Sequence, residues 1–289
     1  MNAAEYCQDK AAKSGSSFYY SFLFLPGEQR HAITALYAFC REVDDVVDEC
    51  SEPAIAQQKL HWWIEEVHRI FHGQPQHPVG LALQTSCEHF DLKEQHLNEI
   101  VEGMLMDVDK NRYRDFQELS VYCYRVAGVV GLLAAEIFGY SDAETLVYAE
   151  KLGLAFQLTN ILRDVKEDAA RGRIYLPLKD LERFNVTEND LLNSIDGPAV
   201  RALLRFQGER AEQCYRDAFS HLPEKDRFNQ RSGLIMSAIY HALLEEISSS
   251  GFDIFNRPVR ISPLKKLWIA WRTSRRENRR HKYYLKNES

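Results

Sequence analysis

The sequence predicts an all-α protein, and three observations support this fold class. None of the nine prolines lies between positions 79 and 176, a window dominated by helical periodicity. No stretch alternates apolar and polar residues for long, and no Asn-Gly or Asp-Gly turn joins two such runs. Short connections such as "SEPA", "GQPQHP" and "SIDGPA" are typical of antiparallel helical neighbours. We therefore expect a single domain over residues 1–289 and no sheet.

The predicted elements follow from apolar residues at helical spacing. In "AITALYAFC", Ile33, Leu36, Tyr37 and Cys40 recur at i, i+3, i+4 and i+7. The same periodicity predicts helices near residues 4–14, 28–49, 53–72, 78–90, 93–108, 115–139, 142–168, 178–183, 188–194, 198–220 and 225–248. No helix is assigned from about residue 257 onward, and we interpret that stretch as a basic amphipathic tail.

Composition narrows the function classes. The chain is 45% hydrophobic and 27% charged with a net charge of −6, which is ordinary for a globular protein and argues against nucleic acid as a partner. The N-terminal "MNAAEYCQDKAAKSGSS" lacks the apolar run of a secretory signal, and the longest apolar run, "VAGVVGLLAA" (126–135), is about half a membrane span. The six cysteines form no CxxC pair and are expected to be reduced: Cys7, Cys40, Cys50, Cys87, Cys123 and Cys214. We expect a cytoplasmic protein.

The segment "CREVDDVVDE" (40–49) places acids where the apolar stripe of its helix continues. Asp44 and Asp48 follow Tyr37 and Cys40 on one face, a helical turn apart, so both carboxylates can reach one point in space. Two close carboxylates at the end of a buried stripe repel each other unless a cation lies between them. The alternative is a solvated helix face, where DxxxD pairs are common.

A second acidic pair lies in "AFQLTNILRDVKEDAARGRIYLP". Asp164 and Asp168 are again one turn apart, and Gln157 and Asn160 extend their stripe toward the helix N-terminus. Apolar residues flank this polar stripe on both sides, which is typical of a helix that lines a polar cavity. Two such pairs, both on helices with apolar faces, favour a site over two solvated surfaces.

The ligand chemistry indicates which cation would bind. Oxygen ligands with no histidine nearby favour Mg²⁺ over zinc or iron. Because Mg²⁺ typically bridges carboxylates to phosphate, an acidic site can bind an anionic substrate through it. Arg41 and Arg163 lie one turn or less before the acids and are candidates to hold phosphate oxygens. The alternative for both arginines is intrahelical pairing with the same acids.

These motifs are similar to those of the squalene/phytoene synthase family. "YAFCREVDDVVDE" and "QLTNILRDVKEDAARGRIYLP" resemble its two aspartate-rich signatures, and the likeness covers roughly residues 5–260, including "SGSSFYYSFLFLP" and "YCYRVAGVVG". The resemblance implies an all-helical isoprenoid-synthase fold with a central substrate cavity. It also implies an enzyme that joins two prenyl diphosphates head to head, with two or three Mg²⁺ ions acting on the diphosphate.

The resemblance further implies roles for individual residues. The four aspartates match those that bind Mg²⁺-diphosphate, with Asn160 as a further metal ligand, and Tyr124 in "YCYRVAG" matches a tyrosine that handles a proton near the departing diphosphate. The positions that match substrate-binding residues are Ser17, Phe18, Tyr37, Arg41, Gln157, Asn160, Arg163 and Tyr240. Without the resemblance, these aromatic residues and the "SSFYYSF" cluster would be core residues. With it, part of the cluster would line a prenyl tunnel and offer π faces to a carbocation.

Within the family, "KAAKSGSSFYYSFLFLP" with "ITALYAFCREVDDVVDE" looks most similar to bacterial presqualene diphosphate synthases of hopanoid biosynthesis. Such enzymes join two farnesyl diphosphates and stop at the cyclopropane intermediate. NADPH is therefore not expected here, and a separate reductase or oxidoreductase would act downstream. The alternatives are a complete squalene synthase, which continues with NADPH, and a phytoene synthase, which uses geranylgeranyl diphosphate.

Two further features fit other classes of protein. "EEVH" (65–68) is a single ExxH motif, whereas a di-iron helical bundle needs two. Between residues 257 and 286 the chain carries eleven Lys/Arg against one acid, Glu277, together with Trp268 and Trp271. This tail predicts peripheral contact with anionic lipid at the inner face of a membrane. The alternatives are a basic end packed over the acidic mouth of the site, and a non-enzymatic helical adaptor that docks through the tail.

Overall fold

The protein is built from helices, which confirms the predicted class. The computed structural model describes residues 2–13, 17–50, 52–257 and 259–288, without the side chains of Ser17, Tyr19 and Glu288. Within these ranges the only β-type pairing is a single bridge between Arg112 and Ile174. In chain order the first elements are α1 (Ala3–Lys13), α2 (Ser17–Phe22), α3 (Gly27–Glu49), α4 (Pro53–Phe71), α5 (Pro78–Cys87), α6 (Glu94–Asp109), α7 (Phe116–Cys123), the π-helical turn η1 (Tyr124–Gly128) and α8 (Val129–Phe138). The others are α9 (Glu144–Ala170), α10 (Leu178–Arg183), α11 (Glu188–Leu192), α12 (Pro198–Ser220), α13 (Glu224–Arg227), α14 (Arg231–Ser249) and α15 (Pro263–Glu288).

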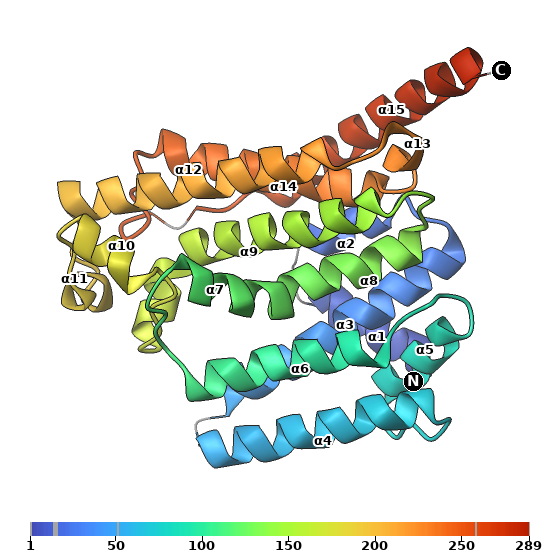
Figure 1. Ribbon diagram of the computed structural model, residues 1–289, viewed down its shortest axis with the longest axis horizontal. Helices are drawn as coiled ribbons and strands as arrows, with labels where there is room; N and C mark the ends of the chain where they lie inside the picture. Colours follow the sequence, from blue (N-terminus) through green and yellow to red (C-terminus); the bar gives the residue numbers. More distant parts are fainter. Residues whose placement is uncertain (1, 14–16, 51, 258, 289) are drawn as a thin grey trace.

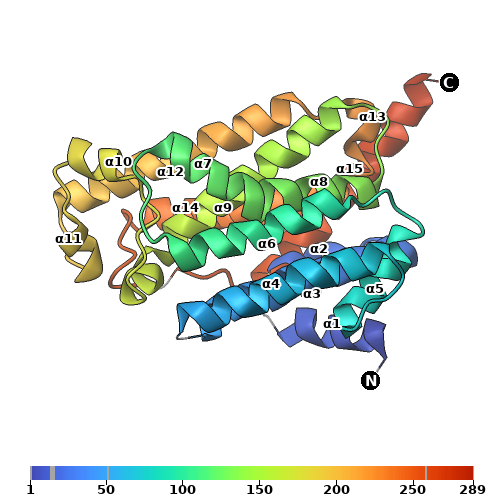
Figure 2. The same ribbon diagram turned by 60° about the horizontal axis from the view of Figure 1, so that its bottom comes forward.

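The long helices lie in layers (Figure 1). α12 and α14 form one outer layer, α9 follows, then the α7–η1–α8 segment and α6, and α4 closes the opposite side. α9 is central because it packs against α12, α8 and α14. Figure 2 shows α3 beside α4 and α6, with α1 on its outer side. In both views α10 and α11 lie at one end of the molecule, and the C-terminal part of α15 projects from the other.

The buried residues form two main clusters that flank the centre of the bundle. One cluster joins α9, α12 and α14, and the other joins α3, α4, α5 and α6. Phe18 and Val126 pack against both clusters. Both residues also line the large cavity of the protein. The cavity therefore lies between two hydrophobic cores, which fix its walls on either side.

The predicted helix at 115–139 is interrupted in the structure. α7 ends at Cys123, a π-helical turn covers Tyr124–Gly128, and α8 continues to Phe138. The segment lies tight against α9, because a Cβ atom at Gly131 would lie 2.2 Å from the Ala149 carbonyl oxygen. Side chains larger than hydrogen would push the two helices apart there. A π-helical turn inside a helix often marks a functional site, and this one borders the cavity.

Two helices were not predicted. α2 is short and aromatic, and its six residues carry no clear helical period. α15 occupies the tail, where charged residues dominate the pattern that would reveal a helix. It packs against α14 and α2 through the buried Ile269 and Ala270. The α15 acid Glu277 is also buried and pairs with Arg227 at 2.8 Å.

Within the described part of the chain, one helical run is long and apolar enough, by length and composition, to cross a membrane. This run is Phe116–Phe138, which exceeds the 126–135 stretch that stands out in the sequence. It packs against α6 and α9 within the bundle, and part of it lines the cavity. A helix that faces a core on one side and an apolar cavity on another has the same composition as a spanning helix. We therefore attribute its apolar character to this position in the core.

Candidate active site

A large cavity runs between α3 and α9 and has a volume of about 560 Å³. This volume is in the range typical of small-molecule sites. α2, α6, the α7–η1–α8 segment and α14 complete its walls. Its polar end holds Asp44, Asp48, Asp164 and Asp168, which lie near the C-terminal ends of α3 and α9. The opposite end reaches Tyr148. Along α9, Tyr148 lies about 24 Å from Asp164 at a rise of 1.5 Å per residue.

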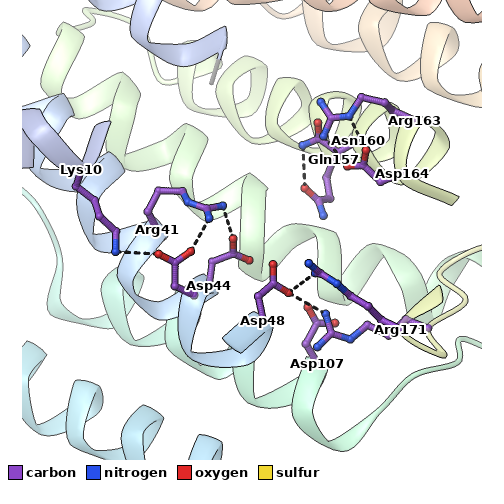
Figure 3. Close-up of polar contacts among 12 residues, drawn as sticks. Lys10, Arg41, Asp44, Asp48, Asp107, Gln157, Asn160, Arg163, Asp164 and Arg171 are labelled. Carbon is purple, nitrogen blue, oxygen red and sulfur yellow. Dashed lines mark hydrogen bonds and ion pairs between the residues drawn. The ribbon is translucent and has the colours of Figure 1, made fainter. Parts of the chain in front are cut away.

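The two acidic pairs come together at this polar end, which we call the mouth. In Figure 3, Asp44 and Asp48 project from α3 toward Asp164 on α9. The α3 stripe that the sequence predicts is confirmed as a buried face, with Ile33 and Leu36 both buried. The aspartates continue that stripe where the helix leaves the core. Neither pair is a fully solvated helix face, since all four side chains border the cavity, and Asp44, Asp164 and Asp168 are only partly exposed.

The acids at the mouth disturb one another's protonation. Burial raises the pKa of Asp44 to about 6, with Arg41 opposing this rise and Asp48 adding to it. Burial, together with the charge of Asp164, raises the pKa of Asp168 to about 8. A carboxyl group that keeps its proton near neutrality lacks enough nearby positive charge. The mouth is therefore an anionic cluster that a bound cation would stabilise.

Both arginines that sequence analysis singled out pair with acids of their own helices. Arg41 Nη1 donates to Asp44 Oδ2 at 2.5 Å, and its other Nη atom donates to Asp45. Arg163 Nε donates to Asp164 Oδ1 at 2.6 Å. The intrahelical alternative thus describes the observed contacts. Because both guanidinium groups also line the cavity, they remain within reach of an anion at the mouth.

Two arginines that were not predicted bridge the mouth. Arg171 Nη1 lies 2.6 Å from Asp48 Oδ1, and Arg173 Nη1 lies 3.2 Å from the same oxygen (Figure 3). Their position depends on Gly172, whose φ of +74° ends α9 in the left-handed conformation that glycine adopts without strain. The chain reverses at this glycine, so both arginines lie opposite α3. The corresponding signal in the sequence is the "RGR" of the second motif.

Aromatic rings enclose the cavity next to the mouth. The ring centroid of Phe18 lies 5.6 Å from that of Tyr37 and 6.4 Å from that of Tyr240. Tyr240 and Phe156 are 4.7 Å apart, and the Tyr240 hydroxyl donates to Asn160 Oδ1 at 3.1 Å. All these side chains line the cavity, as does Gln157, whose amide oxygen lies 3.5 Å from Asn160 Nδ2. The predicted Ser17 begins α2, but its side chain lies outside the described part of the chain.

Tyr124, for which the resemblance implies a role in proton handling, is not among the residues that line the cavity. The Tyr124 ring packs beside Gly128, and burial with the nearby charges of Glu150 and Glu99 raises the pKa of its hydroxyl. Successive residues of a helix are rotated by about 100°, so residues two apart point to nearly opposite sides. Tyr122 faces the cavity instead.

Tyr122 belongs to a buried polar group that sequence analysis missed. Its hydroxyl donates to Asp107 Oδ2 at 2.8 Å, and the Tyr175 hydroxyl donates to Asp107 Oδ1 at 2.8 Å. Burial raises the pKa of Asp107 to about 6, although both hydrogen bonds oppose the rise. Asp107 continues the apolar stripe of Ile100 and Met104 along α6. The pattern that drew attention to Asp44 would therefore also have found Asp107.

The donor atoms at the mouth fit Mg²⁺. They are carboxylate oxygens on α3 and α9 and the amide oxygen of Asn160, and Mg²⁺ prefers oxygen ligands. Among the described residues, no group of three acids at the mouth offers ligand atoms within 4.8 Å of one another. This spacing suits an ion that takes one or two carboxylates and completes its shell with water and phosphate oxygens. Asp44, Asp48, Asn160, Asp164 and Asp168 are the residues that would hold it.

Comparison with known proteins gives the family. The squalene/phytoene synthase profile matches residues 11–265. The chain belongs to the squalene/phytoene synthase family. It is 37% identical over 284 residues to the 15-cis-phytoene synthase of Synechocystis, covering 93% of this chain and 84% of that protein. It is 38% identical over 257 residues to the phytoene synthase of Mycobacterium bovis, covering 88% and 84%.

Solved structures of the family have the same fold. A dehydrosqualene synthase solved with a ligand aligns with a TM-score of 0.84 at 29% identity, covering 99% of this chain and 97% of that one. Squalene synthase HpnC from Alicyclobacillus acidocaldarius aligns with a TM-score of 0.76 at 29% identity, covering 86% and 94%. As a family member, the protein is an isoprenoid-forming enzyme of the prenyltransferase type. The relatives carry several product names, so the product is a separate question.

Proposed function

We propose that the protein joins two farnesyl diphosphates head to head and releases presqualene diphosphate. One observation supports the condensation: two aspartate pairs on separate helices line the mouth of a single cavity that is apolar and aromatic inside. When bound, Mg²⁺ would neutralise the diphosphate and make it a leaving group. The mouth would hold the charged end of each substrate, and the cavity would hold the prenyl chains.

The residues of the mouth would bind diphosphate, and those of the cavity would protect the prenyl cation. Arg41 and Arg163, and the bridging Arg171 and Arg173, would exchange carboxylate partners for diphosphate oxygens. When the carbon–oxygen bond breaks, the prenyl group becomes an allylic cation that water would quench. The aromatic walls around Phe18 exclude water and present π faces to that cation. The cation then adds to the double bond of the second substrate.

Closure of the cyclopropane ring releases a proton, and we propose that Tyr122 receives it. Its hydroxyl already donates to Asp107, so it can accept a proton while passing its own to that carboxylate. An Asp107 pKa of about 6 suits this exchange near neutral pH. Burial raises the pKa of Tyr122 well above its usual value, so the tyrosine would act through Asp107 and not as a free phenolate.

The choice of farnesyl over geranylgeranyl diphosphate rests on resemblance of the N-terminal motifs. The sequence relatives named above are phytoene synthases, whereas the structural neighbours are a dehydrosqualene synthase and a squalene synthase. Phytoene synthesis from two geranylgeranyl diphosphates is therefore the second candidate. Both candidates use the same mouth and differ in how far a chain extends toward Tyr148.

Product analysis distinguishes the candidates. Purified protein with farnesyl diphosphate and Mg²⁺ should give presqualene diphosphate by mass spectrometry, and added NADPH should leave that product unchanged. Conversion to squalene with NADPH would make the protein a complete squalene synthase, and a separate reductase would then not be required. Reaction with geranylgeranyl diphosphate but not farnesyl diphosphate would make it a phytoene synthase. Turnover of neither substrate would contradict the proposal.

We further propose that α15 brings the enzyme to an anionic membrane on the cytoplasmic side. The first half of α15 exposes large apolar side chains, with Leu264 79% exposed and Trp268 53% exposed. Arg272 lies over the Trp268 ring at 5.1 Å, so basic and aromatic groups alternate on this surface. Lys266, on the same helix, lines the cavity. A lipid contact here would lie beside the route of apolar substrates and products.

A further inference from the structure

The end of α4 and the start of α6 carry a group of metal-binding side chains far from the mouth. His68 lies in the last turn of α4, His72 is the residue that directly follows this helix, and Glu94 is the first residue of α6. One ligand atom from each of the three lies within 4.8 Å of the others. We propose that this group binds a divalent transition-metal ion of the Zn²⁺ class. The site is independent of the condensation chemistry.

The local geometry prepares both imidazoles as ligands. The two ring centroids lie 3.8 Å apart, and the ring planes are tilted by 33° to each other. His72 Nδ1 lies 2.8 Å from the carbonyl oxygen of His68. A ring nitrogen that faces a carbonyl carries the proton, which leaves the Nε2 lone pair of His72 for a metal. This backbone contact fixes both the tautomer and the direction of the ring.

Glu94 supplies a third ligand from a second helix. Its Oε1 lies 3.1 Å from His68 Nδ1, so a metal bound there would replace one hydrogen bond by two coordination bonds. The His68 side chain is 62% exposed and that of Glu94 33%, which gives a metal ion access and leaves positions for water. Glu65, the other half of the ExxH motif, pairs with Arg69 at 3.6 Å and is not part of the group.

The donor set distinguishes this group from the mouth. Two imidazole nitrogens and one carboxylate favour Zn²⁺ and related transition metals, whereas the oxygen-only mouth favours Mg²⁺. Because the ligands come from two helices that pack together, a bound ion would fasten the end of α4 to the start of α6. Binding to the folded chain would then raise its melting temperature.

Zinc titration of the full chain tests the proposal. The protein is stripped with a chelator and kept in excess Mg²⁺, which occupies the mouth, and Zn²⁺ binding is followed by calorimetry and by melting temperature. We expect His72→Ala and Glu94→Gln each to lower Zn²⁺ affinity at least tenfold and to remove the rise in melting temperature. His61→Ala is the matched control, because His61 is an exposed α4 histidine whose Nδ1 also faces a carbonyl, that of Gln57 at 2.7 Å.

His61 belongs to no metal-binding group among the described residues, so its variant should bind Zn²⁺ like the parent. All three substituted side chains are partly or largely exposed, and circular dichroism checks that each variant keeps its helical content. Equal Zn²⁺ affinity in the parent, His72→Ala and Glu94→Gln would overturn the proposal. So would a parent protein that binds no Zn²⁺ in excess Mg²⁺.

Discussion

The carboxylates at the mouth destabilise the metal-free protein, but the proposed reaction requires them. Asp44→Asn or Asp164→Asn should lower turnover by about 100-fold or more, because metal assistance to a leaving diphosphate contributes several kcal/mol. Helical content should change little, and the melting temperature should not fall. Glu49→Gln and Glu167→Gln are matched controls, since both acids are exposed neighbours that do not line the cavity. Near-normal turnover in both aspartate variants would contradict the assigned metal site.

Asp168 makes the stability of the metal-free protein depend on pH. Its pKa is raised from the ordinary 3.8 to about 8, so the folded state holds a proton that the unfolded state loses between these values. The free energy of unfolding therefore falls as pH rises toward 8. Asp168→Asn should be more stable than the parent at pH 8.5 by on the order of 2 kcal/mol, after allowance for partial exposure.

That difference should shrink at pH 5, where the parent carboxyl is protonated in the folded state. Urea denaturation of both proteins at the two pH values, with chelator present, measures it. Mg²⁺ with inorganic diphosphate should then stabilise the parent more than the variant. A variant that is no more stable than the parent at pH 8.5 would show that burial and neighbouring charges do not destabilise the ionised form of Asp168.

Tyr122 and Tyr124 form a natural pair of test and control. Tyr122→Phe removes the hydroxyl that donates to Asp107, and we expect turnover to fall by about 10²-fold with substrate binding retained. Tyr124→Phe should leave turnover within a factor of about two, because this ring does not border the cavity. Single-turnover kinetics with farnesyl diphosphate, and binding of an unreactive analogue, separate the two effects. The reverse result would restore Tyr124 as the proton-handling residue.

At the residue scale, the sequence predicted which side chains share one face of a helix. It missed the contacts that depend on how separate elements pack together. Helical spacing alone places Asp44 and Asp48 on one face, whatever packs against it. Arg171 reaches Asp48 only because the chain reverses after α9, and no spacing rule gives that contact. The choice between Tyr122 and Tyr124 depends on how the α7–η1–α8 segment is rotated, which is set by close packing at Gly131.

At the scale of elements, most predicted helices are confirmed to within a few residues because their apolar faces are buried. The helix predicted at 53–72 is observed as α4, and that at 198–220 as α12 with the same limits. The predicted 225–248 divides into α13 and α14, and the predicted 115–139 contains a π-helical turn. Two helices were missed: α2 has only six residues, and α15 is rich in basic residues.

The prediction at the scale of elements concerns membrane binding by α15. The parent protein should float with liposomes that contain anionic lipid at low salt and dissociate at high salt, since each basic residue near the surface contributes about 1 kcal/mol. Trp268→Ala with Trp271→Ala should weaken flotation, because both side chains are about half exposed. Tyr283→Ala, at the exposed far end of α15, serves as the control. Absence of binding at low salt would end the membrane proposal.

At the scale of the whole molecule, the two hydrophobic cores hold α3 and α9 on opposite sides of one cavity. Each helix contributes its own acidic pair at the same end, so the mouth exists only when both cores are formed. The apolar depth behind it accommodates the prenyl chains, and the aromatic walls keep water away from a carbocation. The fold therefore places a charged mouth and an apolar interior within one site, as a condensation of prenyl diphosphates requires.

The most direct test of that arrangement is a crystal structure of the protein with Mn²⁺ and an unreactive thio analogue of farnesyl diphosphate. We predict anomalous peaks within about 2.0–2.3 Å of carboxylate oxygens from both aspartate pairs, with the diphosphate between them. The prenyl chain should extend past Phe18 toward Tyr148. An analogue bound outside this cavity, or Mn²⁺ that contacts neither aspartate pair, would contradict the assignment.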